Sequence, residues 1–323
     1  MKTIAANDKI YETLLTQVRS KIPQNTKLVN TLVDILFIEK EAVYRRLRGE
    51  VPFTFSEIVT ITRNLGISLD AIIGIEGYKS RPLQLKLPHF LNPKKNDLIM
   101  NDGYISTLEK VTACEDTEMA VLTNIVPQDI FPEFDLLTKY IVFKWQYHSQ
   151  NKALPFHEIN IPDSTIRFFK AQLVCTRQIK RTSYVFDNQL CRYIVDDINY
   201  FRSIRMIREE DVLNVKEDVF RLLDYLEHIA INGVFRETNN KASIYVADVD
   251  LTNSYSYIKS KEFNLCSIKA FFLTAATSTD DVIYERVKDW ITATLKLSTL
   301  ITVANEKQRV LYFERQREIV RTL

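Results

Sequence analysis

The residues with the most evident chemistry are three arginines and a tyrosine at positions 44–48, inside the stretch EAVYRRLRGE (41–50). An arginine guanidinium can donate two parallel hydrogen bonds to guanine O6 and N7, or to a phosphate. Tyrosine and lysine reach phosphates and bases, and a glutamate can accept a hydrogen bond from cytosine N4. These residue types predict a DNA-contacting surface. The alternative is an ordinary charged helix face, whose arginines pair with Glu41 and Glu50.

Helical spacing divides this stretch into a buried side and an outward side. At about 100° per residue, Val43 and Leu47 fall on one side of a helix over 39–48 and predict its buried strip. The residues opposite that strip, or at the exposed N-terminal end, are Lys40, Glu41, Tyr44, Arg45 and Arg48. Arg46 lies beside the strip, where its stem would pack and its charged end would reach water. We therefore assign Arg46 a structural role.

The elements around this stretch form a compact helical set. Apolar spacing predicts helices over 8–22, 25–36, 39–48, 54–65 and 69–73. Thr54-Phe55-Ser56-Glu57 has the pattern of a capping box at the start of the fourth helix, and Gly66 ends that helix. Two helices joined by a tight turn and followed by smaller ones are the layout of a helix-turn-helix domain.

Residues 26–74 resemble the Cro/cI-type (lambda-repressor-like, XRE family) helix-turn-helix domains of bacterial regulators. The resembling residues are Leu32-Val33, Leu36-Phe37-Ile38, Val43, Leu47, Arg48-Gly49 and LGISLDAIIG at 65–74. The resemblance implies that the third helix enters the major groove. It implies that Lys40, Glu41, Tyr44 and Arg45 face base edges, and that Arg48, Thr26 and Lys27 contact phosphate.

The sequence departs from this family at the turn. Phe37 stands where Gly or Asn is usual, because that position needs a positive φ, which is costly for a bulky residue. Glu39 stands where Ser or Thr usually caps the third helix. We expect either a different turn or a Phe37 side chain that docks in the core.

The remaining chain predicts a linker and a larger mixed domain. Residues 78–97 contain Pro82, Pro88 and Pro93, and their lack of periodicity favours an extended linker or a strap on a domain surface. Beyond them, helices are predicted over 97–113, 134–147, 163–181, 216–231, 279–298 and 307–323, and strands over 118–126, 242–251 and 265–274. We expect the last two strands to pair antiparallel. The predicted fold is therefore mainly α, with a helix-turn-helix domain at 1–77 and an α+β domain with a small antiparallel sheet at 98–323.

Composition argues against several function classes. The net charge of +2 lies within residues 1–80, which hold 11 basic and 9 acidic residues, so bulk charge alone would not hold nucleic acid. The six glycines form no phosphate-binding loop, and the scattered cysteines and histidines form no metal-binding spacing. Asp248 and Asp250 are interpreted as a solvated strand end rather than a metal site. We expect no cofactor, no metal and no enzymatic activity.

Together these observations predict a DNA-binding transcriptional regulator. It would bind an inverted-repeat operator in double-stranded DNA as a homodimer, with residues 98–323 providing dimerisation and sensing of an unidentified small-molecule effector. No apolar run reaches the ~18 residues needed to span a bilayer, so a cytoplasmic location is expected. Two alternatives stay open. One is an interaction or ligand-sensing protein whose helix-turn-helix domain no longer binds DNA, and the other is an enzyme with a regulatory DNA-binding domain.

Overall fold

The computed structural model describes residues 2–22, 24–67, 69, 72, 83–149, 153–262, 264–271 and 273–323. Within those ranges, no helix combines the length and the apolar character needed to span a bilayer. The chain divides into two compact units, Met1–Pro82 and Leu83–Leu323.

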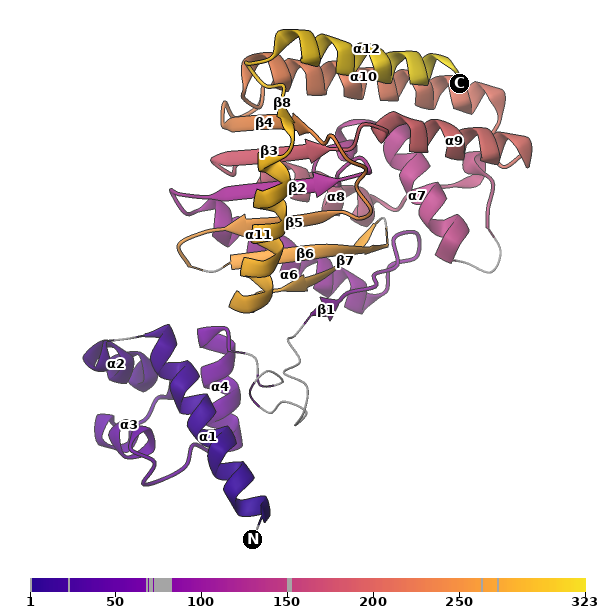
Figure 1. The fold of residues 1–323 in the computed structure, drawn as a ribbon. Coiled ribbons are helices and arrows are strands. Elements are labelled where there is room, and N and C mark those ends of the chain that lie inside the picture. The colour runs from indigo at the N-terminus through magenta and orange to yellow at the C-terminus, as the bar shows by residue number, and fades with distance from the viewer. Residues whose placement is uncertain are drawn as a thin grey trace. The chain divides into compact units, whose positions relative to one another are not determined.

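The first unit is helical in its described part. Its helices are α1 (Lys2–Lys21), α2 (Asn25–Leu36), α3 (Lys40–Leu47) and α4 (Phe55–Leu65) (Figure 1). They match the predicted helices within a few residues, except that α1 begins earlier. One core joins them, built from Leu14, Val18, Leu28, Leu32, Val43, Leu47 and Ile61 among others. The predicted fifth helix, 69–73, falls largely outside the described residues.

Local signals set where α4 begins and ends. Thr54 N donates a hydrogen bond to Glu57 Oε2 at 2.8 Å, and Glu57 N donates to Thr54 Oγ1 at 3.3 Å. This is the predicted capping box, which satisfies two N–H groups at the start of the helix. Gly66 ends α4 in the left-handed conformation, with φ of 62°.

The turn between α2 and α3 differs from both sequence-based expectations. Phe37 takes the left-handed conformation, with φ of 53°, and its N–H donates to Val33 O at 2.9 Å. Its side chain is 92% exposed, so it does not dock in the core. The turn therefore contains a left-handed residue, and Phe37 bears the steric cost of that conformation.

The second unit is built on one mixed sheet. Within the described residues its strands are β1 (Gln84–Leu85), β2 (Glu118–Thr123), β3 (Arg181–Phe186), β4 (Lys241–Val246), β5 (Tyr255–Lys259), β6 (Asn264–Phe271), β7 (Thr274–Ser278) and β8 (Thr299–Leu300). Their order is β1-β7-β6-β5-β2-β3-β4-β8. The central strands β2, β3 and β4 run parallel, and every other pairing is antiparallel.

The prediction of a small antiparallel sheet is therefore wrong, and so is the predicted pairing of 242–251 with 265–274. Three strands, β3, β2 and β5, lie between β4 and β6. Alternation identifies a strand, but it does not identify the neighbour. Long helical connections after β2 and β3 return the chain for parallel pairing, which a hairpin cannot do.

Helices cover both faces of this sheet. They are α6 (Lys95–Thr112), α7 (Asp135–Ser149), α8 (Asp163–Arg177), α9 (Leu190–Ser203), α10 (Glu209–Asn232), α11 (Asp281–Lys296) and α12 (Glu306–Arg321), with short turns η1 (Phe131–Glu133) and η2 (Phe156–Glu158). Figure 1 shows α11 crossing the sheet. On that face Ala120 and Leu122 of β2 are buried, whereas Met119 and Val121 are buried on the other face, in the core shared with the remaining helices. A strand buried on both faces explains the continuous apolar run of β2.

The predicted linker is partly built into the second unit. Residues 78–82 lie outside the described residues, but β1 pairs with β7, and Phe90 is buried against the rings of Trp145 and Phe169. Thr165 Oγ1 also donates to Phe90 O at 2.6 Å. Residues 83–94 thus form a strap on the second unit, the second of the two arrangements expected for this stretch.

Candidate functional site

Helix α3 presents the predicted DNA-contacting residues on one surface. Val43 is fully buried and Leu47 is 9% exposed, so these two residues fix which side of α3 meets the core. The exposed residues are Lys40, Glu41, Tyr44, Arg45 and Arg48, and we call them the α3 face. Thr26 and Lys27 are also exposed, in the first turn of α2. All seven predicted residues are accessible, and α3 brings five of them together.

The arginines of the α3 face have acidic partners. Arg48 Nε lies 2.7 Å from Glu50 Oε1, Arg48 Nη2 lies 3.4 Å from Glu41 Oε1, and Arg45 Nε lies 3.6 Å from Glu50 Oε2. The pairing expected under the alternative interpretation is therefore present. The hydrogen bond from Arg48 holds the pKa of Glu50 below its usual value, so Glu50 is ionised at neutral pH. All four side chains are exposed, and water and salt screen such pairs.

Arg46 has the structural role assigned to it from the sequence. Its Nε and Nη2 atoms contact the two carboxylate oxygens of Glu57 at 3.1 and 2.9 Å, and both side chains are largely buried. Partial burial raises the pKa of Glu57, but the Thr54 N–H and the Arg46 guanidinium outweigh it, so the pKa is lowered. The ion pair thus ties α3 to the capping box of α4.

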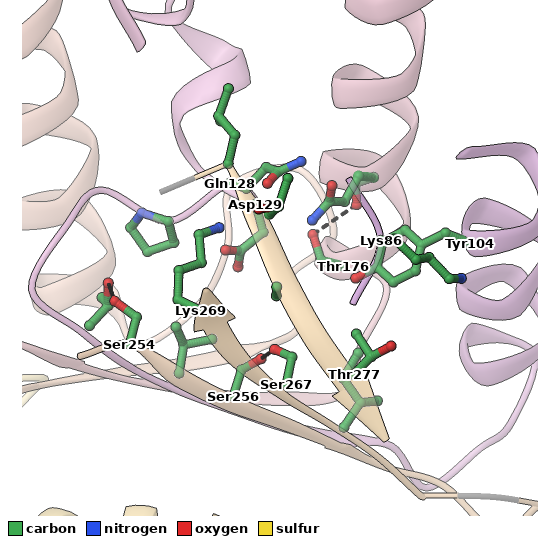
Figure 2. A pocket seen from close by; sticks show the side chains of 18 of the residues that line it. Lys86, Tyr104, Gln128, Asp129, Thr176, Ser254, Ser256, Ser267, Lys269 and Thr277 are labelled. Atoms are coloured by element: carbon green, nitrogen blue, oxygen red, sulfur yellow. Dashed lines mark hydrogen bonds between the residues drawn. The ribbon is translucent and has the colours of Figure 1, made fainter. Parts of the chain in front are cut away.

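The second unit contains a cavity of about 170 Å³ that sequence reasoning did not predict. It lies between the strap, α6, α8 and strands β5, β6 and β7 (Figure 2). Much of its wall is apolar, from Phe90, Met100, Met119, Val121, Phe168, Ile258 and Leu273 among others. Its charged lining residues are Lys86, Asp129 and Lys269.

Asp129 and Lys269 are the polar centre of this cavity. Asp129 is buried and accepts a hydrogen bond from the Tyr184 hydroxyl at 2.5 Å. Figure 2 shows Lys269 and Asp129 pointing toward one another. Burial raises the pKa of Asp129, and burial lowers the pKa of Lys269 to about 8 although the Asp129 charge opposes that shift. Among the described residues, no side-chain hydrogen bond and no ion pair within 4.0 Å holds Lys269 Nζ.

Two further polar atoms in the lining lack partners. Gln172 Oε1 on α8 and Thr274 Oγ1 on β7 are buried without a hydrogen bond from any described residue. Burying a polar atom without a partner costs about 1–3 kcal/mol. Both atoms are closed off from solvent, so a bound molecule would reach them only if the side chain rotates.

The sequence contains one local signal for this cavity, on β6. Ser267 and Lys269 alternate along β6 with Cys266 and Ile268, which face the α11 side. A lysine on a half-buried strand face needs an explanation, because lysine is seldom buried without a partner. The other lining residues come from segments far apart in the sequence, so no local motif could join them.

No metal site is found in the described part of the chain, where no group of three acidic, histidine or cysteine side chains could hold an ion. Asp248 and Asp250 were predicted on a strand, but β4 ends at Val246 and both residues are exposed beyond it. The four cysteines are free thiols. No protein-family model, no curated protein and no solved structure matches this chain.

Proposed function

We propose that this protein is a sequence-specific DNA-binding transcriptional regulator whose α3 face contacts base edges in the major groove. The observation that carries the proposal is the arrangement of α3. The helix follows α2 after the three-residue turn 37–39 and buries Val43 and Leu47, which leaves Arg45 and Arg48 exposed on the other side. This arrangement suits the helix-turn-helix mode of DNA binding, in which the second helix of the pair enters the groove.

The ion pairs of the α3 face are compatible with this role. Arg45 and Arg48 are held by Glu41 and Glu50 in the free protein, at positions open to water. Bidentate contacts to guanine or phosphate would replace these screened pairs. The pairs also hold the arginines in place before binding, which reduces the entropy lost on contact.

The start of α2 offers a complementary phosphate contact. Gln24 precedes the helix, and no side-chain hydrogen bond from it caps the first turn. Free N–H groups at a helix N-terminus attract phosphate, and Lys27 adds a positive charge there. These groups would position α3 without selecting a sequence.

The proposal includes a homodimer in the cytoplasm that binds an inverted repeat. A single small module with little net charge should bind weakly, and two copies joined through the second unit would multiply the affinity. The half-sites would lie about one helical turn apart.

Selection of bound sequences from random duplex DNA tests the proposal. We expect an enriched inverted repeat, whose binding weakens steeply as salt rises because counterions are released from DNA. The Arg45→Ala, Arg48→Ala double variant should bind at least tenfold more weakly, as expected when two base or phosphate contacts are lost. Arg63→Ala removes another exposed arginine, on α4, and should have no effect. Failure to enrich any sequence, or equal affinity of the double variant, would overturn the proposal.

A second function is favoured by one observation. The carboxylates of Glu41 and Glu50 lie beside the two arginines and reduce the positive potential of the α3 face. A surface of mixed charge suits a protein partner better than a phosphate backbone. In that case DNA selection yields nothing, whereas the Arg45→Ala, Arg48→Ala variant loses a protein complex instead.

A further inference from the structure

We propose that the cavity of the second unit binds a small organic acid, in which a carboxylate contacts Lys269 and an apolar body fills the space between the strap, α6 and α8. This inference does not depend on DNA binding. It rests on the size of the cavity, its charges and its unpartnered polar atoms.

The cavity has the size and the walls for a small ring or a short alkyl chain. Its volume of about 170 Å³ is close to the ~150 Å³ that is known to accept benzene in an apolar protein cavity. Phe90, Phe168 and Leu273 supply apolar contact area. A molecule of about ten non-hydrogen atoms therefore fits, with its polar end at Lys269.

The charges select an anion. Two lysines and one aspartate line the cavity, which leaves one positive charge in excess. Asp129 already accepts the Tyr184 hydroxyl, and Lys269 Nζ has no direct partner among the described residues. Asp129 acts on this ammonium group only through its charge, and a carboxylate would add a direct ionic contact that offsets the desolvation of Lys269. A cationic ligand would instead meet the like charge of Lys269.

Two lining side chains carry polar atoms without a hydrogen-bond partner among the described residues. Gln172 Oε1 and Thr274 Oγ1 are each more than nine-tenths buried, and both line the cavity. Native proteins leave few such atoms unsatisfied, so rotation of either side chain toward a bound molecule would supply the missing hydrogen bond.

The strap forms one wall of the site. Lys86, Pro88 and Phe90 line the cavity, and their segment follows the first unit directly in the sequence. The start of the strap is held to the sheet by the two-residue pairing of β1 with β7. A bound acid would add further contacts to the strap. We therefore expect ligand binding to slow amide hydrogen exchange in residues 83–90.

Calorimetric titration of the full chain tests this inference. The probes are phenylacetate and hexanoate, with phenylacetamide, phenethylamine and inorganic phosphate as controls. We expect the carboxylates to bind with dissociation constants in the millimolar range or below, as for fragments of this size, and at least tenfold more tightly than the controls. Lys269→Met should abolish carboxylate binding, whereas Lys259→Met, at an exposed lysine of β5, should leave it unchanged.

The comparison of phenylacetate with phenylacetamide uses the unmodified protein, so it decides the matter even if Lys269→Met fails to fold. Equal binding of these two probes would overturn the inference. So would preferential binding of phosphate or amine, undiminished binding by a folded Lys269→Met variant, or no saturable carboxylate binding at millimolar concentration. None of these outcomes bears on whether the α3 face binds DNA.

Discussion

Replacement of Phe37 by glycine is expected to stabilise the first unit. Phe37 ends α2 with φ of 53°, a conformation that costs an L-residue about 1–2 kcal/mol. Its side chain is 92% exposed, so removing it sacrifices almost no buried area. Glycine also adds conformational entropy to the unfolded chain, which offsets about 0.5–1 kcal/mol of the stability gained by relieving that conformation. The net expectation is a gain of about 0.5–1 kcal/mol in the free energy of unfolding.

Urea denaturation separates the two units, because both tryptophans, Trp145 and Trp290, lie in the second unit. Tryptophan fluorescence therefore follows that unit, whereas far-ultraviolet circular dichroism also includes the first. The Phe37→Gly substitution should raise the urea midpoint of the first unit's transition, which circular dichroism detects and tryptophan fluorescence does not. Phe37→Ala is the matched control, since it removes the ring but keeps the β-carbon, and should change stability by less than about 0.5 kcal/mol.

A Phe37→Gly variant less stable than Phe37→Ala would refute this reasoning. That result would mean that position 37 gains nothing from relief of a left-handed conformation. The turn between α2 and α3 would then differ from the one described.

Arg46→Met should destabilise the first unit by about 1–3 kcal/mol, because it removes two contacts to the largely buried carboxylate of Glu57. Arg45→Met, at an exposed arginine of the same helix, should cost less than about 0.5 kcal/mol. Urea denaturation followed by circular dichroism measures both changes. Glu50→Gln should raise DNA affinity several-fold at low salt, because it removes a negative charge beside Arg45 and Arg48. Fluorescence anisotropy with labelled DNA measures the change. An unchanged affinity would mean that the α3 face does not contact DNA. Phenylacetate binding should weaken as pH rises through about 8, where Lys269 loses its proton, whereas below that pH the ammonium form is intact. An affinity that does not change between about pH 7 and pH 9 would contradict the role of Lys269.

Two tyrosine hydroxyls that interact electrostatically with Asp129 do not titrate in the same pH range. Burial raises the pKa of Tyr104 to about 12, and the pKa of Tyr184 is also raised, so both hydroxyls keep their protons through this range. Burial raises the pKa of Asp129.

Local signals in the sequence were sufficient for most of the first unit. Thr54 and Glu57 form the capping box that their spacing predicts, and Val43 and Leu47 occupy the core as their helical spacing requires. Phe37 was recognised as unusual at its position, but neither expected resolution was correct. An exposed left-handed residue can be identified only once the backbone is known.

Sheet order and the cavity depend on contacts that no local pattern specifies. Strand β3, RTSYVF, was not predicted, and only its first residue, Arg181, fell within the predicted helix 163–181. Helix α9 was not predicted either, although Cys191, Val195 and Ile198 have helical spacing. Without β3, the parallel centre of the sheet could not be derived. The cavity then required knowing that the strap, α8 and β6 meet, although they lie far apart in the chain.

Repeating the DNA selection with single substitutions tests the central claim most directly. If Arg45 contacts a base, Arg45→Ala should relax the preference at one position of each half-site and cost about 1–3 kcal/mol of binding free energy there. Arg48→Ala, as a phosphate contact, should retain the same consensus, bind it more weakly and lower the salt dependence by about one counterion. An unchanged consensus and unchanged affinity in both variants would contradict the assignment of the α3 face.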